Sequence, residues 1–316
     1  MNQAATRKPS KLGLGNKKEI LFYSLFIAIP VVHFLVFYVY INFNSILLAF
    51  QTHNLTDGGY VVDFAGFENF KTAWANSFGG TEGWIHIKNS LTLLSVMLFV
   101  VTPLALLFSY YMYKKAFLSG FYKVILFMPQ LLSGVVLGVL FKHIVTTVYI
   151  DVMGGGTTQG LLTNVDTKFG TVLFFNVMMG FGVNVLTYTS TMSGVNESLI
   201  ESAQLDGANA VQEFWYIVLP LIYPTVTTLM IVEFSHVFTN QYHLYTLFGT
   251  AGNEVSSVGY FLYVQAQSSA LAASEISGNY LSYSVLSAMG LILTAIVLPT
   301  TLIIRRLLEK YGPSAD

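Results

Sequence analysis

Six long apolar segments run through this chain of 316 residues, and they restrict its fold more than any other feature. Their approximate bounds are 20–42, 91–113, 122–145, 169–192, 221–242 and 280–304. A helix of about 20 apolar residues crosses the hydrocarbon core of a membrane, where backbone groups must hydrogen-bond within the segment. Only 10% of the residues are charged, whereas soluble domains average about a quarter. The sequence therefore predicts an all-α, polytopic membrane protein with six transmembrane helices.

Basic residues predict how these helices are oriented. Eleven of the fifteen Lys and Arg residues precede the first span, separate the second from the third, or follow the sixth. They are Arg7, Lys8, Lys11, Lys17, Lys18, Lys114, Lys115, Lys123, Arg305, Arg306 and Lys310. Because Lys and Arg near span ends are retained on the cytoplasmic side, we expect both termini and the loop between the fourth and fifth spans there. The first apolar segment is longer than that of a cleaved signal peptide, so we interpret it as an uncleaved anchor.

Several kinds of site are not expected in this chain. The glycine-rich segment 154–160 lacks the Gly-Lys-Ser/Thr ending of a nucleotide-binding loop, so we interpret it as an external turn. The chain contains no cysteine, and no His and carboxylate spacing indicates a metal site. The external segment 51–88 carries turn signals at 57–59 and 79–80 and is expected to fold on itself. We expect no cofactor, no ATPase site and no nucleic-acid partner.

One acidic stretch interrupts the apolar C-terminal half, at about residues 194–220. No basic residue occurs between Lys168 and Arg305, so its carboxylates are expected to form a cluster of uncompensated negative charge. They belong to Glu197, Glu201, Asp206 and Glu213. The apolar residues at helical spacing among them are Leu199, Ile200 and Leu205. This pattern predicts a short amphipathic helix suited to docking on a partner.

Local signals divide this stretch into two short helices that meet at a bend. Ser198 and Glu201 have the spacing of a capping box, and Asn209 and Gln212 have the spacing of a second one. Gly207, between them, can adopt the positive φ that ends a helix. An alternative is that Glu201 serves only as a capping residue.

The acidic stretch resembles the cytoplasmic coupling loop of permease subunits in ABC importers. That loop has the pattern Glu-Ala-Ala, then Asp-Gly-Ala, an aromatic residue, Ile and Leu-Pro. The matching residues here are Glu201, Ala203, Asp206, Gly207, Ala208, Phe214, Ile217, Leu219 and Pro220, with Ser202 in place of the usual Ala. The whole chain is similar to the carbohydrate-importer branch, in which an extra helix precedes a five-helix core. The corresponding parts are a tail at 1–19, the extra helix and its external loop at 20–84, the core at 85–305 and a tail at 306–316.

The resemblance implies the type I ABC importer fold and a permease subunit of an ATP-driven, binding-protein-dependent importer. In such importers the loop enters a groove on an ATPase subunit, and a sugar or oligosaccharide crosses by alternating access. The implied contacts with the ATPase are Glu201, Ser202, Ala203, Leu205, Asp206, Gly207, Ala208 and Phe214. The implied partners are a second permease subunit in a heterodimer, two ATPase subunits that hold ATP and Mg, and an extracytoplasmic solute-binding protein. The implied location is the bacterial cell (inner) membrane.

Polar residues inside the predicted spans are candidates for contact with the solute, because ionisable groups in lipid spans almost always face a cavity or the bundle interior. They are Glu233, His236, Asn240 and Gln241 near the fifth span and Asn184 and Tyr188 on the fourth. The first three are spaced i, i+3 and i+7, which would place them on one helix face. An alternative for each is a hydrogen-bonded strut between helices.

An enzyme, a secondary transporter and a channel are the alternative functions. A membrane enzyme would need a clustered catalytic set, and a secondary transporter would usually show repeated halves with interrupted helices; the sequence shows neither pattern. Hydropathy alone does not exclude a channel, but a channel needs no docking loop. The predicted fourth to sixth spans contain no Lys or Arg, which favours a neutral sugar over an anionic, glycerol-phosphate-like solute.

Overall fold

Six long apolar helices dominate the computed structural model, which describes residues 17–56, 59–153, 159–272 and 282–313. Each is long and apolar enough to cross a membrane. They are Leu21–Leu48, Gly83–Tyr113, Gly134–Met153, Val165–Met192, Ala210–Ser235 and Tyr283–Tyr311. The prediction of a helical protein with six transmembrane helices is confirmed. The predicted N-terminal tail and glycine-rich turn fall largely outside the described residues.

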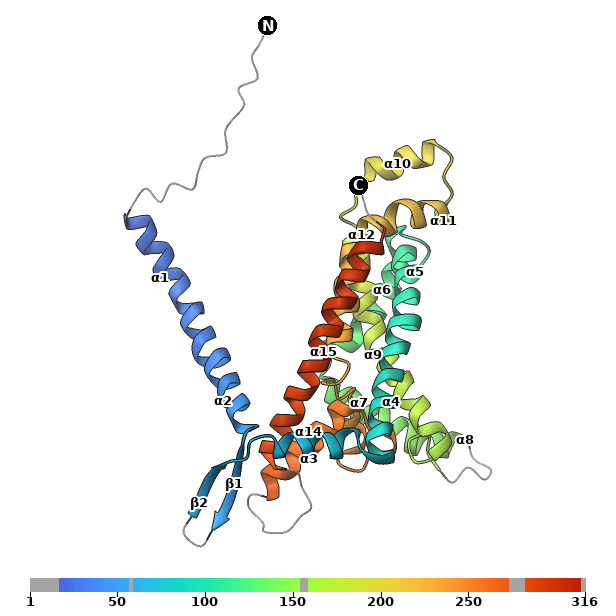
Figure 1. Cartoon of the computed structure of the whole chain (residues 1–316). Coiled ribbons are helices and arrows are strands. Elements are labelled where there is room, and N and C mark those ends of the chain that lie inside the picture. Colours follow the sequence, from blue (N-terminus) through green and yellow to red (C-terminus); the bar gives the residue numbers. More distant parts are fainter. Residues whose placement is uncertain (1–16, 57–58, 154–158, 273–281, 314–316) are drawn as a thin grey trace.

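The first span diverges from the bundle (Figure 1). It consists of α1 (Lys17–Phe34), a π-helical turn (Leu35–Tyr40) and α2 (Ile41–Leu48). α1 stands apart from the other helices, and α2 contacts α15 (Tyr283–Tyr311). Its most apolar window has no buried residue. An apolar helix that contacts so little of its own chain needs lipid or another subunit to cover it.

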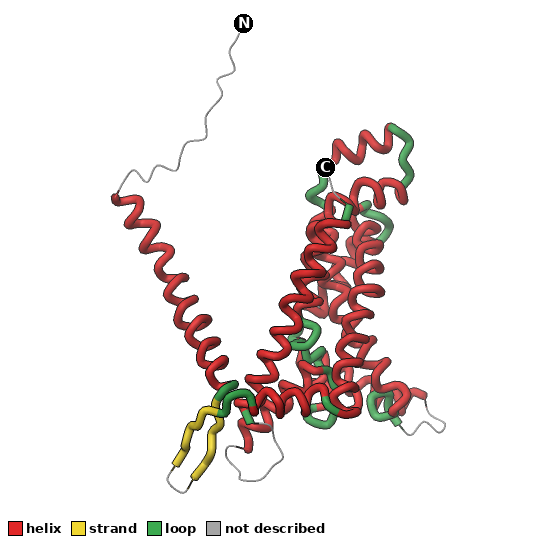
Figure 2. Tube along the Cα trace, viewed as in Figure 1, coloured by secondary structure: helices red, strands yellow, loops and turns green. Residues whose placement is uncertain are grey.

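A small extramembrane unit follows the first span. β1 (Gln51–Thr56) and β2 (Gly59–Phe64) form an antiparallel pair, and α3 (Glu68–Phe78) packs against α15 at the adjacent end of the bundle (Figures 1 and 2). The buried Asn69 amide ties α3 to the chain after α2, because it donates to the carbonyl oxygens of Ala49 and Gln51 at 2.9 Å each. The external segment therefore folds on itself as predicted, although the strand pair is an addition to the prediction.

The other long helices pack as a bundle around the fourth span. The bundle helices are α4 (Gly80–Val96), a π-helical turn (Met97–Val101) that leads into α5 (Thr102–Tyr113), α9 (Val165–Met192), α12 (Leu219–Ser235) and α15 (Tyr283–Tyr311). Ser109 on α5 donates to the carbonyl oxygen of Val185 on α9 at 2.9 Å. Small hydroxyl residues allow this close approach of two membrane helices.

The third span is interrupted, so the prediction of one continuous helix there is wrong. The observed elements are α6 (Ser119–Leu131), α7 (Gly134–His143), a π-helical turn (Ile144–Val148) and α8 (Tyr149–Met153). Pro129 removes one helical hydrogen bond, and the backbone becomes extended at Leu132 and Ser133. After the break α7 packs so closely on α13 (Leu244–Phe248) that a Cβ added to Gly138 would lie 2.5 Å from Thr246 Cγ2.

The predicted fifth span also ends too late. α12 stops at Ser235, and the chain then turns, with positive φ angles of 50° at Tyr242 and 57° at His243. The elements between this turn and α15 are α13, a 3₁₀ turn (Asn253–Val255) and α14 (Val258–Ala272). They are too short to span a membrane, so a search for long apolar runs does not find them.

Candidate functional site

The loop between α9 and α12 projects from one end of the bundle (Figure 1). It contains α10 (Glu197–Leu205) and α11 (Ala210–Glu213), which continues through a π-helical turn (Phe214–Val218) into α12. Gly207 has a φ of 84°, and the Ala208 amide donates to the Ala203 carbonyl oxygen at 2.9 Å, closing the end of α10. The prediction of two short helices meeting at a glycine bend is confirmed.

The caps of these helices differ in part from the prediction. Asn209 and Gln212 form the predicted capping box, with both hydrogen bonds at 2.9 Å. The box predicted at Ser198 and Glu201 is wrong, because Asn196 is the N-cap and its Oδ1 accepts from the Ser198 amide at 3.1 Å. Asn196 precedes the first helical residue and has the extended backbone that an N-cap needs. Glu201 therefore does not cap α10.

One side of α10 is open to solvent and mixes carboxylates with apolar groups. We call it the docking face, and its residues are Glu197, Leu199, Glu201, Leu205 and Asp206, all exposed. Leu205 is 89% exposed, whereas Ile200, on the other side of the helix, is only 6% exposed and packs into the bundle. Within the described chain, the Glu201 side chain has no hydrogen-bond or ion-pair partner. The face carries unpaired negative charge beside exposed leucines.

Two residues of the predicted acidic loop lie inside the protein instead. The predicted cluster of four uncompensated carboxylates is wrong for Glu213, which is paired with Lys114 at 2.7 Å. Lys114 follows α5 and is distant in sequence, which is why counting basic residues along the C-terminal half could not identify it. Phe214 is 3% exposed and its ring lies 5.1 Å from that of Tyr110, so it packs beneath the loop rather than on its surface. Of the other predicted contacts, Ser202 and Gly207 are exposed and Ala203 and Ala208 are partly buried.

The polar helix face predicted on the fifth span does not exist. Glu233 lies in the last turn of α12, His236 follows the helix, and Asn240 belongs to the turn region. The Asn240 side chain accepts a hydrogen bond from the Tyr242 amide at 2.8 Å. It therefore stabilises the turn. Gln241 is partly buried, and its Oε1 has no hydrogen-bond partner among the described residues.

The structure does bring some of the predicted pathway residues together. Glu233 lies close enough to Tyr188 and Tyr242 to interact with them electrostatically, and these three residues form what we call the polar interior cluster. Tyr188 is 1% exposed and lies near the Thr102 side chain. Burial raises the pKa of Tyr242, so its hydroxyl stays protonated, and among the described residues this group has no hydrogen-bond partner. Asn184, one turn before Tyr188, is partly buried.

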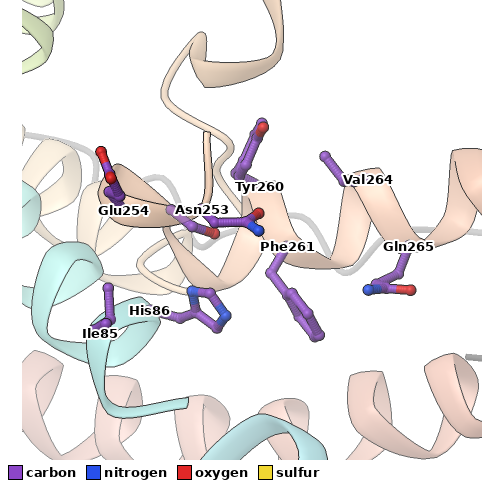
Figure 3. Close-up of a pocket in the computed structure, with 9 residues that line it drawn as sticks. Ile85, His86, Asn253, Glu254, Tyr260, Phe261, Val264 and Gln265 are labelled. Carbon is purple, nitrogen blue, oxygen red and sulfur yellow. The ribbon is translucent and has the colours of Figure 1, made fainter. Parts of the chain in front are cut away.

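A cavity of about 320 Å³ lies at the end of the bundle opposite the docking face. Figure 3 shows His86, Asn253 and Phe261 around it, with Gln265 further along α14. The His86 ring stacks on Phe261 at 4.8 Å, and the nearby Glu254 carboxylate pairs with Lys168. Sequence reasoning missed this cavity because it depends on α14. The described residues contain no group of three or more His, Cys, Asp or Glu side chains placed to hold a metal.

The chain is similar to permease proteins of several transport systems. The arabinooligosaccharides transport system permease protein AraP of Bacillus subtilis is 28% identical over 307 residues, which cover 92% of this chain and 91% of that protein. The multiple sugar-binding transport system permease protein MsmF of Streptococcus mutans is 23% identical, with coverage of 75% and 82%. The sn-glycerol-3-phosphate transport system permease protein UgpA of Shigella flexneri is 26% identical, with coverage of 65% and 69%.

A solved structure shares the fold. A chain of a bacterial ABC transporter that imports the acidic polysaccharide alginate matches with a TM-score of 0.73 and 20% identity, over 94% of this chain and 97% of that one. Residues 89–313 also match the family model of the binding-protein-dependent transport system inner membrane component. Because that match spans all the described helices from α5 to α15, the chain belongs to the family of binding-protein-dependent transport system inner membrane components.

Proposed function

We propose that this chain is the permease subunit of an ATP-driven importer that carries a sugar or oligosaccharide across a bacterial inner membrane. The observation that carries the proposal is the docking face on α10, an exposed surface with unpaired carboxylates at one end of a transmembrane bundle. The named functions of AraP and MsmF support a sugar as the solute. A channel would have no need of such a surface.

The docking face suits a groove on an ATPase subunit. Glu201 and Asp206 would meet basic groups there, and the exposed Leu205 side chain would fill an apolar part of the groove. ATP and Mg would bind to two such ATPase subunits, not to this chain. Closure of the ATPases would then favour one of two permease conformations, because docking contacts shift an equilibrium only when they differ between the states.

Two further partners complete the proposed complex. A second, different permease subunit would pack beside this chain, where the first span offers an apolar surface that the rest of the chain leaves uncovered. A solute-binding protein would deliver the sugar at the opposite end of the bundle from α10, where the hairpin, α3 and the cavity beside His86 lie (Figure 1). We place the docking end in the cytoplasm, as the distribution of basic residues predicts.

The polar interior cluster is the proposed contact with the solute during passage. The hydroxyls of Tyr188 and Tyr242 and the Glu233 carboxylate supply donors and acceptors that fit the hydroxyls of a sugar. Asn184, Gln241 and His236 are secondary candidates, because each lies within four positions of a member of the cluster in the sequence. A glycerol-phosphate-like solute, as carried by UgpA, is the second candidate. The Glu233 carboxylate disfavours it, because like charges repel in a medium of low dielectric constant.

Charge reversal on the docking face tests the proposal. In proteoliposomes containing the complete complex, Glu201→Lys should lower ATP-driven uptake of a radiolabelled oligosaccharide about tenfold or more, since one lost close charge pair and one new repulsion cost more than about 1.4 kcal/mol. Glu309→Lys is the matched control, because Glu309 is exposed on α15 near the same end but lies outside the loop. Equal uptake by the Glu201→Lys complex and the control would contradict the proposal.

A further inference from the structure

A buried polar network lies directly beneath the docking face. At its centre is Glu213, which is 1% exposed at the end of α11. Lys114, just after α5, places its Nζ atom 2.7 Å and 2.9 Å from the two carboxylate oxygens. Gln204 of α10 donates to the same carboxylate at 3.0 Å, and the Tyr110 hydroxyl of α5 lies 3.0 Å from it. One carboxylate thus joins α5, α10 and α11.

Apolar packing continues from this network into the bundle. Ile200 of α10 and Phe214 belong to a buried cluster that also includes Met192 and Tyr188 of α9. Tyr188 is a member of the polar interior cluster. Close-packed interiors transmit displacement because their side chains have little space to yield. The helices held by Glu213 are therefore in continuous contact with the proposed solute pathway.

Few other contacts fix the direction of α10. Ile200 is its one buried residue, and a single apolar contact leaves a short helix able to pivot. The hydrogen bond from Gln204 to Glu213 supplies a second point of attachment near the end of α10. The Tyr110 hydroxyl also lies 2.9 Å from the Ala210 carbonyl oxygen, which attaches the start of α11 to α5. The polar network, rather than apolar burial, thus sets the angle between the docking face and α5.

We propose that Glu213 is a positioning residue that clamps the two loop helices to α5, so that movement of the docking face is passed to α5 and on to the polar interior cluster. This role rests on the proposed coupling to an ATPase. A purely structural ion pair would behave differently. Apolar replacement of both members of a buried pair is often neutral for stability, whereas removal of one member alone leaves a buried charge unpaired. The informative variant therefore replaces Glu213 and Lys114 together, and loss of coupling with assembly intact in that variant separates the two roles.

The test uses the complete complex in proteoliposomes, with uptake of labelled oligosaccharide measured per ATP hydrolysed. The double variant Glu213→Leu/Lys114→Met should lower this ratio about fivefold or more, a typical size for lost coupling between sites, while the amount of assembled complex stays near wild type. Lys114→Arg alone should keep the ratio near the wild-type value, because the guanidinium also pairs with a carboxylate through two donors. Lys123→Met is the matched control, since this exposed lysine has no ion pair in the described part of the chain and its loss should leave the ratio unchanged.

A second readout does not depend on the solute. In the nucleotide-free complex, Glu213→Leu/Lys114→Met should increase amide hydrogen exchange across 197–213, and Lys123→Met should not. The proposal is overturned if the double variant keeps the wild-type ratio, or if uptake falls only in proportion to assembled complex. Absence of ATP-driven uptake in the wild-type complex would instead refute the proposed function, so the two failures are distinguishable.

Discussion

At the residue scale, burial places the carboxylates of one short loop in two different environments. Glu201 is exposed and unpaired within the described chain, whereas Glu213, twelve positions later, is buried and held by Lys114. Both residues are glutamates, and only their positions in the fold distinguish them. Lys114 lies 99 positions before Glu213, so the pairing could not be read from local sequence.

The two tyrosines of the polar interior cluster offer a test at the same scale. Tyr242→Phe removes a buried hydroxyl that has no hydrogen-bond partner among the described residues, so the assembled complex should be as stable as wild type. If this hydroxyl binds solute, the solute concentration at half-maximal uptake should rise about threefold to tenfold, the value of one hydrogen bond.

Tyr188→Phe is the contrasting variant. It removes a hydroxyl that interacts with the Thr102 side chain in the buried core, so the melting temperature of the complex should fall as well. Unchanged uptake in Tyr242→Phe, measured over a range of oligosaccharide concentrations, would exclude Tyr242 from the solute pathway.

At the element scale, the packing of α9 depends on glycine at one position and not at another. A Cβ on Gly182 would lie 2.4 Å from the Leu126 carbonyl oxygen, and this backbone atom of α6 cannot rotate away. Gly182→Ala should therefore destabilise the complex by about 1–3 kcal/mol, as overpacking does. Gly170→Ala on the same helix meets nothing within 4 Å and should be tolerated. The melting temperatures of the two purified variant complexes, measured by thermal unfolding, test this difference. Equal melting temperatures would contradict the α6–α9 contact.

Long periodic elements could be predicted from sequence, and elements determined by tertiary contacts could not. The six spans and the bend at Gly207 follow from hydropathy and glycine geometry, which are local. The end of α12 at Ser235 and the turn through Tyr242 and His243 interrupt an apolar run, so hydropathy alone extends the helix too far. The cap of α10 was misassigned because Asn196 and Ser198 are both good N-cap residues, and the choice depends on where the chain leaves α9.

The sequence could likewise predict only part of the candidate site. The exposed residues Glu201, Leu205 and Asp206 lie on the surface where a docking loop would need them. Phe214 matches the family pattern but packs inside, and this difference is invisible to a motif because an aromatic residue suits both places. The polar interior cluster combines residues from α9, α12 and the following turn, so no single helix periodicity could have found it.

At the scale of the whole molecule, the chain has its surfaces for different partners at opposite ends. The docking face lies at one end, and the hairpin, α3 and the cavity beside His86 lie at the other (Figure 1). The polar interior cluster draws on α9, α12 and the turn that follows α12. The exposed first span diverges from the bundle and contacts it through α2. This arrangement fits a subunit that receives solute at one end and mechanical work at the other.

The central claim, that the docking face contacts an ATPase, is tested most directly by cross-linking from Leu205. The chain has no cysteine, so Leu205→Cys introduces a unique thiol at a residue that is 89% exposed. In the complete complex, a short thiol-to-amine reagent should join this position to a lysine of the ATPase subunit and stop ATP-driven uptake. Val62→Cys, exposed on β2 at the opposite end, should give no ATPase adduct under the same conditions. An ATPase adduct from Val62→Cys but none from Leu205→Cys would contradict the claim.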